Sequence, residues 1–150
     1  MSVSAKFAGD HEQQGAVVLQ QSKGASAIAK GDVLSLSSNK WVTAATNAAG
    51  PFAVAKETKA SGDATISILF QGIVYVVADG TINPNNRVQV SGSTAGRVIV
   101  SADAGATQGQ TTNFQRNVGI YLGHENEGDG VTEATACASG DTIRILLGAY

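Results

Sequence analysis

The chain has 150 residues, including 18 glycines, 23 alanines and one cysteine, and its formal net charge is −2. Charged residues make up 15% of it, against about 25% in an average globular protein, so it lacks the basic surface typical of nucleic-acid binding. No apolar run is long enough for a membrane-spanning helix, the first residues lack the apolar core of a signal peptide, and the lone Cys137 excludes an intrachain disulfide.

The N-terminal segment, residues 1–25, is polar and shows no sustained period. Phe7 and the run at 16–19 are its only apolar anchors. Two interpretations stay open: a first edge strand with a frayed start, or an extended arm that becomes ordered on a partner surface. The expected partner-binding residues of the chain are Val3, Phe7, His11, Val17, Leu19 and Trp41.

Residues 26–150 have the pattern of a single β domain, in which short apolar runs alternate with clusters of Gly, Asn, Asp and Ser. No stretch has the 3.6-residue period of a helix. About nine short strands are predicted, at 33–36, 41–43, 52–55, 65–70, 73–77, 87–90, 97–100, 118–122 and 142–147.

An internal repeat organises this domain into two similar units, at about 28–72 and 82–148. The turn Ala-Ser-Gly-Asp at 60–63 and again at 138–141 precedes a strand of the same pattern. Ile28, Leu34 and Leu36 match Ile82, Val88 and Val90 at a constant offset of 54 residues. The second unit is longer because of inserts at about 101–116 and 123–137. The sequence therefore predicts an all-β fold, a compact barrel or sandwich built from two units, with an N-terminal arm.

The candidate catalytic residues are few. His124 with Cys137 could form a nucleophile pair, but the setting of Cys137 is that of a small packed residue. No Gly-x-Ser-x-Gly motif selects a serine nucleophile, and no glycine-rich phosphate-binding motif is present. We expect no enzyme activity and no cofactor.

The acidic loop at 124–130 resembles the start of a calcium loop, because Glu125, Glu127 and Asp129 alternate before Gly130. The twelfth position of an EF-hand loop requires a bidentate glutamate, and here it is Ala136. We expect a solvated acidic loop and no metal site. A metal-dependent enzyme around His124 and Glu125 is the competing interpretation, and bound metal in the purified protein would support it.

The order of the short motifs resembles the head decoration, or capsid cement, proteins of tailed bacteriophages, in particular the small Gly/Ala-rich β-barrel members. The motifs are Gly31–Leu34, Trp41–Val42, Phe52–Ala55, Ala60–Asp63, Gln71–Val74, Val118–Ile120 and Gly140–Ile145. The resemblance covers about 28–148 and implies a structural virion protein, made in the host cytoplasm, that binds the outer surface of the assembled capsid. It further implies the major capsid protein as partner, a homotrimer, and no catalytic residues.

The alternative function is a tail-associated or fibre-like adhesion domain that binds a host surface ligand. Such domains are also β structures rich in Gly, Ser and Thr, and they usually expose aromatic residues that stack on sugars. This chain has one Trp, three Tyr and four Phe.

Overall fold

The computed structural model describes residues 7–11, 17–102, 116–125, 132–133 and 135–148. Within these ranges the chain forms β-strands and no α-helix, which confirms the predicted fold class. The strands are β1 (Val17–Ser22), β2 (Val33–Ser37), β3 (Lys40–Thr43), β4 (Phe52–Ala55), β5 (Thr65–Val77), β6 (Arg87–Val90), β7 (Val98–Val100), β8 (Asn117–Glu125), β9 (Thr132–Glu133) and β10 (Thr142–Leu147).

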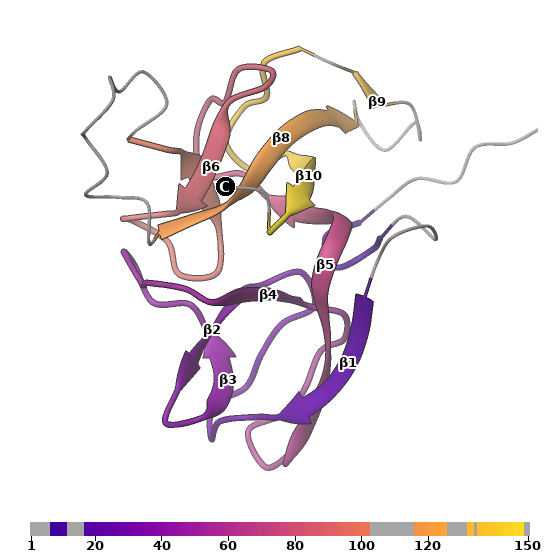
Figure 1. Cartoon of the computed structure of the whole chain (residues 1–150), viewed down its shortest axis with the longest axis vertical. Coiled ribbons are helices and arrows are strands. Elements are labelled where there is room, and N and C mark those ends of the chain that lie inside the picture. Colours follow the sequence, from indigo (N-terminus) through magenta and orange to yellow (C-terminus); the bar gives the residue numbers. More distant parts are fainter. Residues whose placement is uncertain (1–6, 12–16, 103–115, 126–131, 134, 149–150) are drawn as a thin grey trace, which may run out of the picture.

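Antiparallel pairing joins the strands in the order β3-β2-β4-β5-β10-β8-β6-β7, while β1 pairs with β5 and β9 pairs with β8. Strand β5 links two halves of the molecule (Figure 1). We call β1–β4 with Thr65–Gln71 of β5 the lower half, and Gly72–Val77 of β5 with β6–β10 the upper half.

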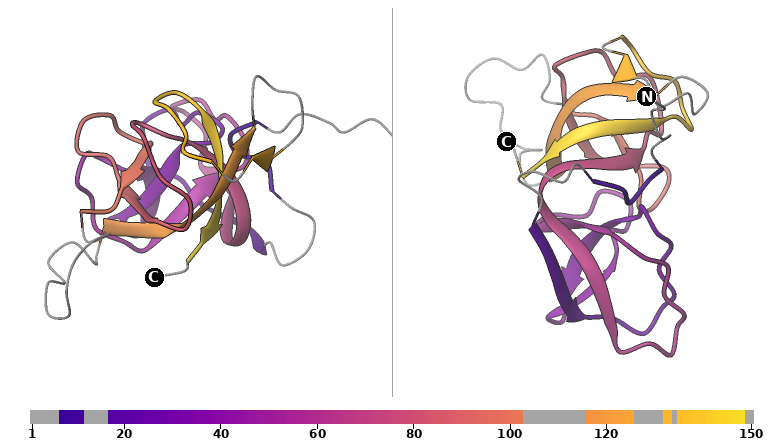
Figure 2. Two further views of the ribbon diagram at one scale, coloured as in Figure 1. Left: turned by 90° about the horizontal axis from the view of Figure 1, so that it is seen from above. Right: turned by 90° about the vertical axis from the view of Figure 1, so that its right-hand side faces the viewer.

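The long strand β5 corrects one prediction. The sequence predicts two strands, at 65–70 and 73–77, separated by Gln71 and Gly72, but the backbone stays in one strand of 13 residues. Gly72 has a φ of 108°, which an L-residue rarely adopts, so it bends the strand and does not end it. The second view in Figure 2 shows β5 passing from one half into the other.

The two halves have the same strand order. In the lower half the order is β3-β2-β4-β5, and in the upper half it is β7-β6-β8-β10. A fifth strand then pairs with the last one, namely β1 with the first part of β5 and the second part of β5 with β10. These strands follow one another in the chain as they do in the two repeat units read from the sequence.

Matching bridges curl each half into a small barrel-like sheet. In each half, the residue after the fifth strand forms a parallel bridge to the first strand in the order, which is β3 below and β7 above. These bridges are Lys23–Trp41 and Ala78–Val98. A second, antiparallel bridge follows at Ile28–Lys59 and at Ile82–Cys137. The curling therefore takes place within each half and not around both units together.

Turns closed by aspartate recur at the starts of strands. The Asp63 carboxylate accepts a hydrogen bond from the amide of Ala60 at 2.9 Å, and the Asp141 carboxylate accepts one from Ala138 at 2.8 Å. Asp32 accepts one from Ala29 in the same way, at 3.2 Å. A short acceptor three residues after the amide it binds satisfies the backbone locally, so these turns fix where the strands begin.

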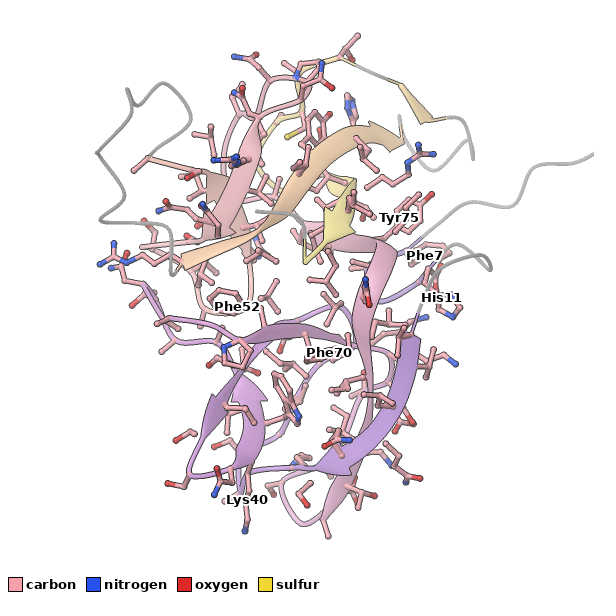
Figure 3. All side chains as sticks on the ribbon, in the orientation of Figure 1. Phe7, His11, Lys40, Phe52, Phe70 and Tyr75 are labelled. Atoms are coloured by element: carbon pink, nitrogen blue, oxygen red, sulfur yellow. The ribbon has the colours of Figure 1, made fainter. Side chains whose placement is uncertain are left out.

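Two cores meet at β4, which is buried on both faces. Phe52 and Val54 belong to the larger core that extends through the upper half, whereas Ala53 and Ala55 face the smaller core inside the lower half. Figure 3 shows Phe52 at the boundary between the halves. A strand covered on both faces loses the alternation of apolar and polar residues, which explains its uniformly apolar sequence.

Candidate functional site

The N-terminal segment lies along β5. His11 forms an antiparallel bridge to Val74, and β1 continues in the same direction, from Val17 opposite Gln71 to Ser22 opposite Thr65. At 7–11 and 17–22 the segment therefore lies against its own chain. Figure 3 shows Phe7 and His11 beside Tyr75.

Residues 7–10 form a tight turn that is fastened to both halves. The Asp10 carboxylate accepts a hydrogen bond from the Phe7 amide at 2.8 Å and forms an ion pair with Lys30 Nζ, also at 2.8 Å. The Gly9 amide donates to the Tyr75 carbonyl at 2.7 Å, and the Tyr75 amide donates to the Asp10 carbonyl at 3.0 Å. This turn holds Phe7 in place, although its side chain is 64% exposed.

Strand β1 is exposed along its whole length. It has no charged residue and no proline, and it pairs with β5 along one edge only before the bridge at Lys23. Val17, Val18 and Leu19 remain about two-fifths exposed, and Phe70 beside them on β5 is 40% exposed. An edge strand without charges or proline is poorly protected against pairing with another chain. Together with Phe7, these residues form what we call the N-terminal surface.

The structure separates the predicted partner-binding residues into three groups. Phe7, Val17 and Leu19 lie on the N-terminal surface, and His11 is half-buried against β5. Trp41 is only 5% exposed; it packs in the lower core, edge-on to Phe70 with ring centroids 6.1 Å apart. Val3 lies outside the described residues. The partner contacts of all six residues stay predictions.

The sequence did not identify Val18 and Phe70 as exposed apolar residues, although both are part of the N-terminal surface. Val18 lies within the predicted apolar run, but alternation alone could not reveal that both faces of β1 are exposed. Phe70 lies in a predicted strand whose pattern suggests burial, but it is 40% exposed, two residues before the bend of β5 at Gly72.

The predicted nucleophile pair lies in a buried cluster of the upper half. The Tyr121 hydroxyl donates to the Thr135 carbonyl at 2.6 Å and lies 2.7 Å from His124 Nδ1. Because the hydroxyl proton is directed at Thr135, His124 Nδ1 is assigned as the donor to the tyrosine oxygen. Burial raises the pKa of the Tyr121 hydroxyl, which keeps it protonated.

Cys137 is a thiol held in the core. It is 3% exposed, and its Sγ lies 3.6 Å from the Gly80 carbonyl. Burial raises the pKa of the Cys137 thiol, which disfavours the thiolate that a nucleophile requires. The geometry of this cluster therefore fits a packing role for Cys137 and Tyr121.

Two aspartates, Asp79 and Asp32, have opposite pKa shifts. A hydrogen bond from the Ser91 hydroxyl lowers the pKa of Asp79, and Thr94 Oγ1 also donates to it at 3.1 Å. Burial raises the pKa of Asp32, although the Thr43 hydroxyl donates to its carboxylate at 2.9 Å. Both carboxylates accept hydrogen bonds from hydroxyl groups that lie 11 to 15 residues away in the chain, so each ties neighbouring segments of the fold together.

Among the described residues, no three His, Cys, Asp or Glu side chains gather as metal ligands. Glu127, Asp129 and Gly130 of the acidic loop lie outside those residues. No helix in the described part of the chain is long and apolar enough to cross a membrane.

No protein-family model matches the sequence, and neither does any curated protein. Among solved structures, the chain is similar to a chain of "The capsid of Myoviridae Phage XM1", with a TM-score of 0.58. The match has 11% sequence identity and covers 95% of this chain and 91% of that chain. At this identity the comparison establishes a shared fold over nearly the whole chain.

Proposed function

We propose that the chain is a structural, non-enzymatic protein of a bacteriophage particle that binds the outer surface of the assembled capsid and stabilises it. The observation that carries the proposal is the fold shared with a chain of a phage capsid structure over 95% of this chain. The order of motifs, which resembles that of decoration proteins, is a second and separate support.

The physical character of the molecule fits this role. A stabilising protein must bury surface against several capsid subunits, which requires a rigid body and an exposed contact surface rather than a catalytic centre. The body here consists of two halves joined through β5, and the N-terminal surface offers Phe7, Val17 and Leu19 for contact. The major capsid protein is the proposed partner, and a homotrimer is the proposed oligomer.

The test of this function uses emptied shells that lack the protein. Purified protein should co-sediment with these shells and raise the temperature at which they rupture. Phe7 is 64% exposed in the free protein and would be buried at the contact with the shell. Phe7→Ser removes its ring and should therefore weaken binding several-fold. A matched control is Leu36→Ser, which removes a 42% exposed apolar side chain next to the β2–β3 hairpin turn of the lower half.

Shells that neither bind the protein nor gain heat resistance would contradict the proposal. Cryo-EM of intact particles should place the protein on the shell. A position on the tail would instead support the adhesion alternative. The mass of the free protein in sedimentation equilibrium tests the trimer separately.

A further inference from the structure

We propose that strand β1 exchanges between copies of this chain, so that β1 of one copy occupies the place beside β5 of another. The inference goes beyond the proposed function and does not depend on it, because it concerns the isolated protein. It rests on a comparison of the fifth strand in the two halves.

The two fifth strands occupy equivalent positions. Ser22 lies opposite Thr65 in the lower half, and Val77 lies opposite Thr142 in the upper half. The hydrogen bonds that follow also match: the Lys23 amide donates to the Ala64 carbonyl at 2.9 Å, and the Ala78 amide donates to the Asp141 carbonyl at 2.9 Å.

The origin of the fifth strand differs between the halves. In the upper half it is the second part of β5, which is covalently continuous with the last strand of the lower half. The upper half is thus completed by a strand that another unit supplies. In the lower half the fifth strand is β1, which belongs to the N-terminal segment and precedes β2–β5 in the chain.

The two strands also differ in how firmly they are packed. Tyr75 and Val76 of the upper half are 1% and 0% exposed, whereas Gln20 and Gln21 at the equivalent positions of β1 are exposed. At the next equivalent position both residues are buried, but the upper half has the apolar Ala78 and the lower half has Lys23. The Lys23 ammonium donates to the Gly24 carbonyl at 2.8 Å. Less apolar burial means a lower free energy for local opening of β1 than for the second part of β5.

A second copy is the occupant that fits the vacated position. It presents the same strand, so every contact between β1 and β5 can re-form between two chains with no new complementarity required. The turn at Phe7–Asp10 precedes β1 and bonds to Tyr75 and Lys30. The copy that receives β1 has the same Tyr75 and Lys30, so these bonds can re-form there as well. In the connection from β1 to Ile28, Lys23 and Gly24 are buried and their amides bond to Ala64 and Trp41, so they move with β1. The hinge is therefore placed at 25–27, where the three residues are small and exposed.

The experiment uses disulfide trapping at the Ser22–Thr65 pair. Because the adjacent Lys23–Ala64 pair is hydrogen-bonded, Ser22 and Thr65 form a non-hydrogen-bonded pair, with Cα atoms about 4.5 Å apart, which suits a disulfide. One preparation carries S22C and a second carries T65C. They are mixed, unfolded, refolded together at high concentration and then oxidised.

If β1 exchanges, the mixture gives a cross-linked pair containing one chain of each variant, in large excess over either homodimer. The matched control is the pair V77C and T142C, at the equivalent positions of the upper half, where β5 is continuous and cannot exchange alone. Mixing these two single variants should give no such excess.

The double variant S22C/T65C shows whether the chain folds and the bond can form, since at low concentration it should close a disulfide within one chain. If the double variant closes and the mixed single variants give no excess of the mixed pair, strand exchange is wrong. Equal cross-linking of the V77C and T142C mixture would also overturn it, because the trapping would then report collisions.

Discussion

Gly119 and Gly62 differ in what surrounds their α-carbons, and this difference predicts opposite tolerance to the same substitution. A Cβ at Gly119 in β8 would lie 2.2 Å from the Leu146 carbonyl oxygen and 2.9 Å from its carbon, both backbone atoms of β10. A Cβ at Gly62 would meet no atom within 4 Å. The Gly119 position therefore requires glycine because another strand approaches it closely.

We expect Gly119→Ala to lower the free energy of unfolding by about 1–3 kcal/mol or more, because β8 and β10 must separate to accept the methyl group. Gly62→Ala should change it little, or raise it by about 0.4–1 kcal/mol through a less flexible unfolded chain. Urea denaturation of both variants measures the difference. Equal destabilisation by the two would contradict the assigned close approach.

At the scale of elements, β1 and the second part of β5 make the same pairing with different burial. In an antiparallel pair every second residue directs its amide at the partner strand. Leu19 and Gln21 are four and two residues before Lys23, so their amides bond to β5 as that of Lys23 bonds to Ala64. By the same count from Ala78, the amides of Val74 and Val76 bond to β10. Hydrogen exchange followed by NMR should show the amides of Leu19 and Gln21 exchanging well before those of Val74 and Val76, because β1 opens locally. Indistinguishable protection of the two sets would mean that β1 is as firmly held as the core.

Most strands could be predicted from the sequence, because apolar runs between Gly, Asn and Asp clusters reflect the period of two and the local turn bonds. The continuity of β5 could not, since Gly72 between two apolar runs has the same appearance whether it bends a strand or ends it. The burial of Trp41 could not be predicted either, because one strand alone does not show which of its faces the lower core will cover. On the candidate site, the exposure of Val17 and Leu19 depends on what covers β1, and that is a property of the tertiary fold.

At the scale of the whole molecule, the two halves are joined through shared strands and a shared core. Strand β5 supplies pairing to both, and β4 is buried between their cores. The Val33 amide donates to the Gly96 carbonyl at 2.9 Å, and the Gly96 amide donates to the Ala44 carbonyl at 3.0 Å, so backbone bonds also cross the junction. Because unfolding one half would expose the face of β4 that the other half covers, we infer that the halves unfold together.

The chain contains one tryptophan and one cysteine, and they lie in different halves, which makes this cooperativity measurable. Trp41 is buried in the lower core, and Cys137 is buried in the upper half. In guanidinium chloride, the loss of native Trp41 fluorescence and the gain of Cys137 reactivity toward a thiol reagent should follow a single transition with one midpoint. Val54→Ala, which removes two methyl groups from a fully buried position, should shift both midpoints down together. Separate midpoints for the two residues would show that the shared strands do not couple the halves, and that each half is stable by itself.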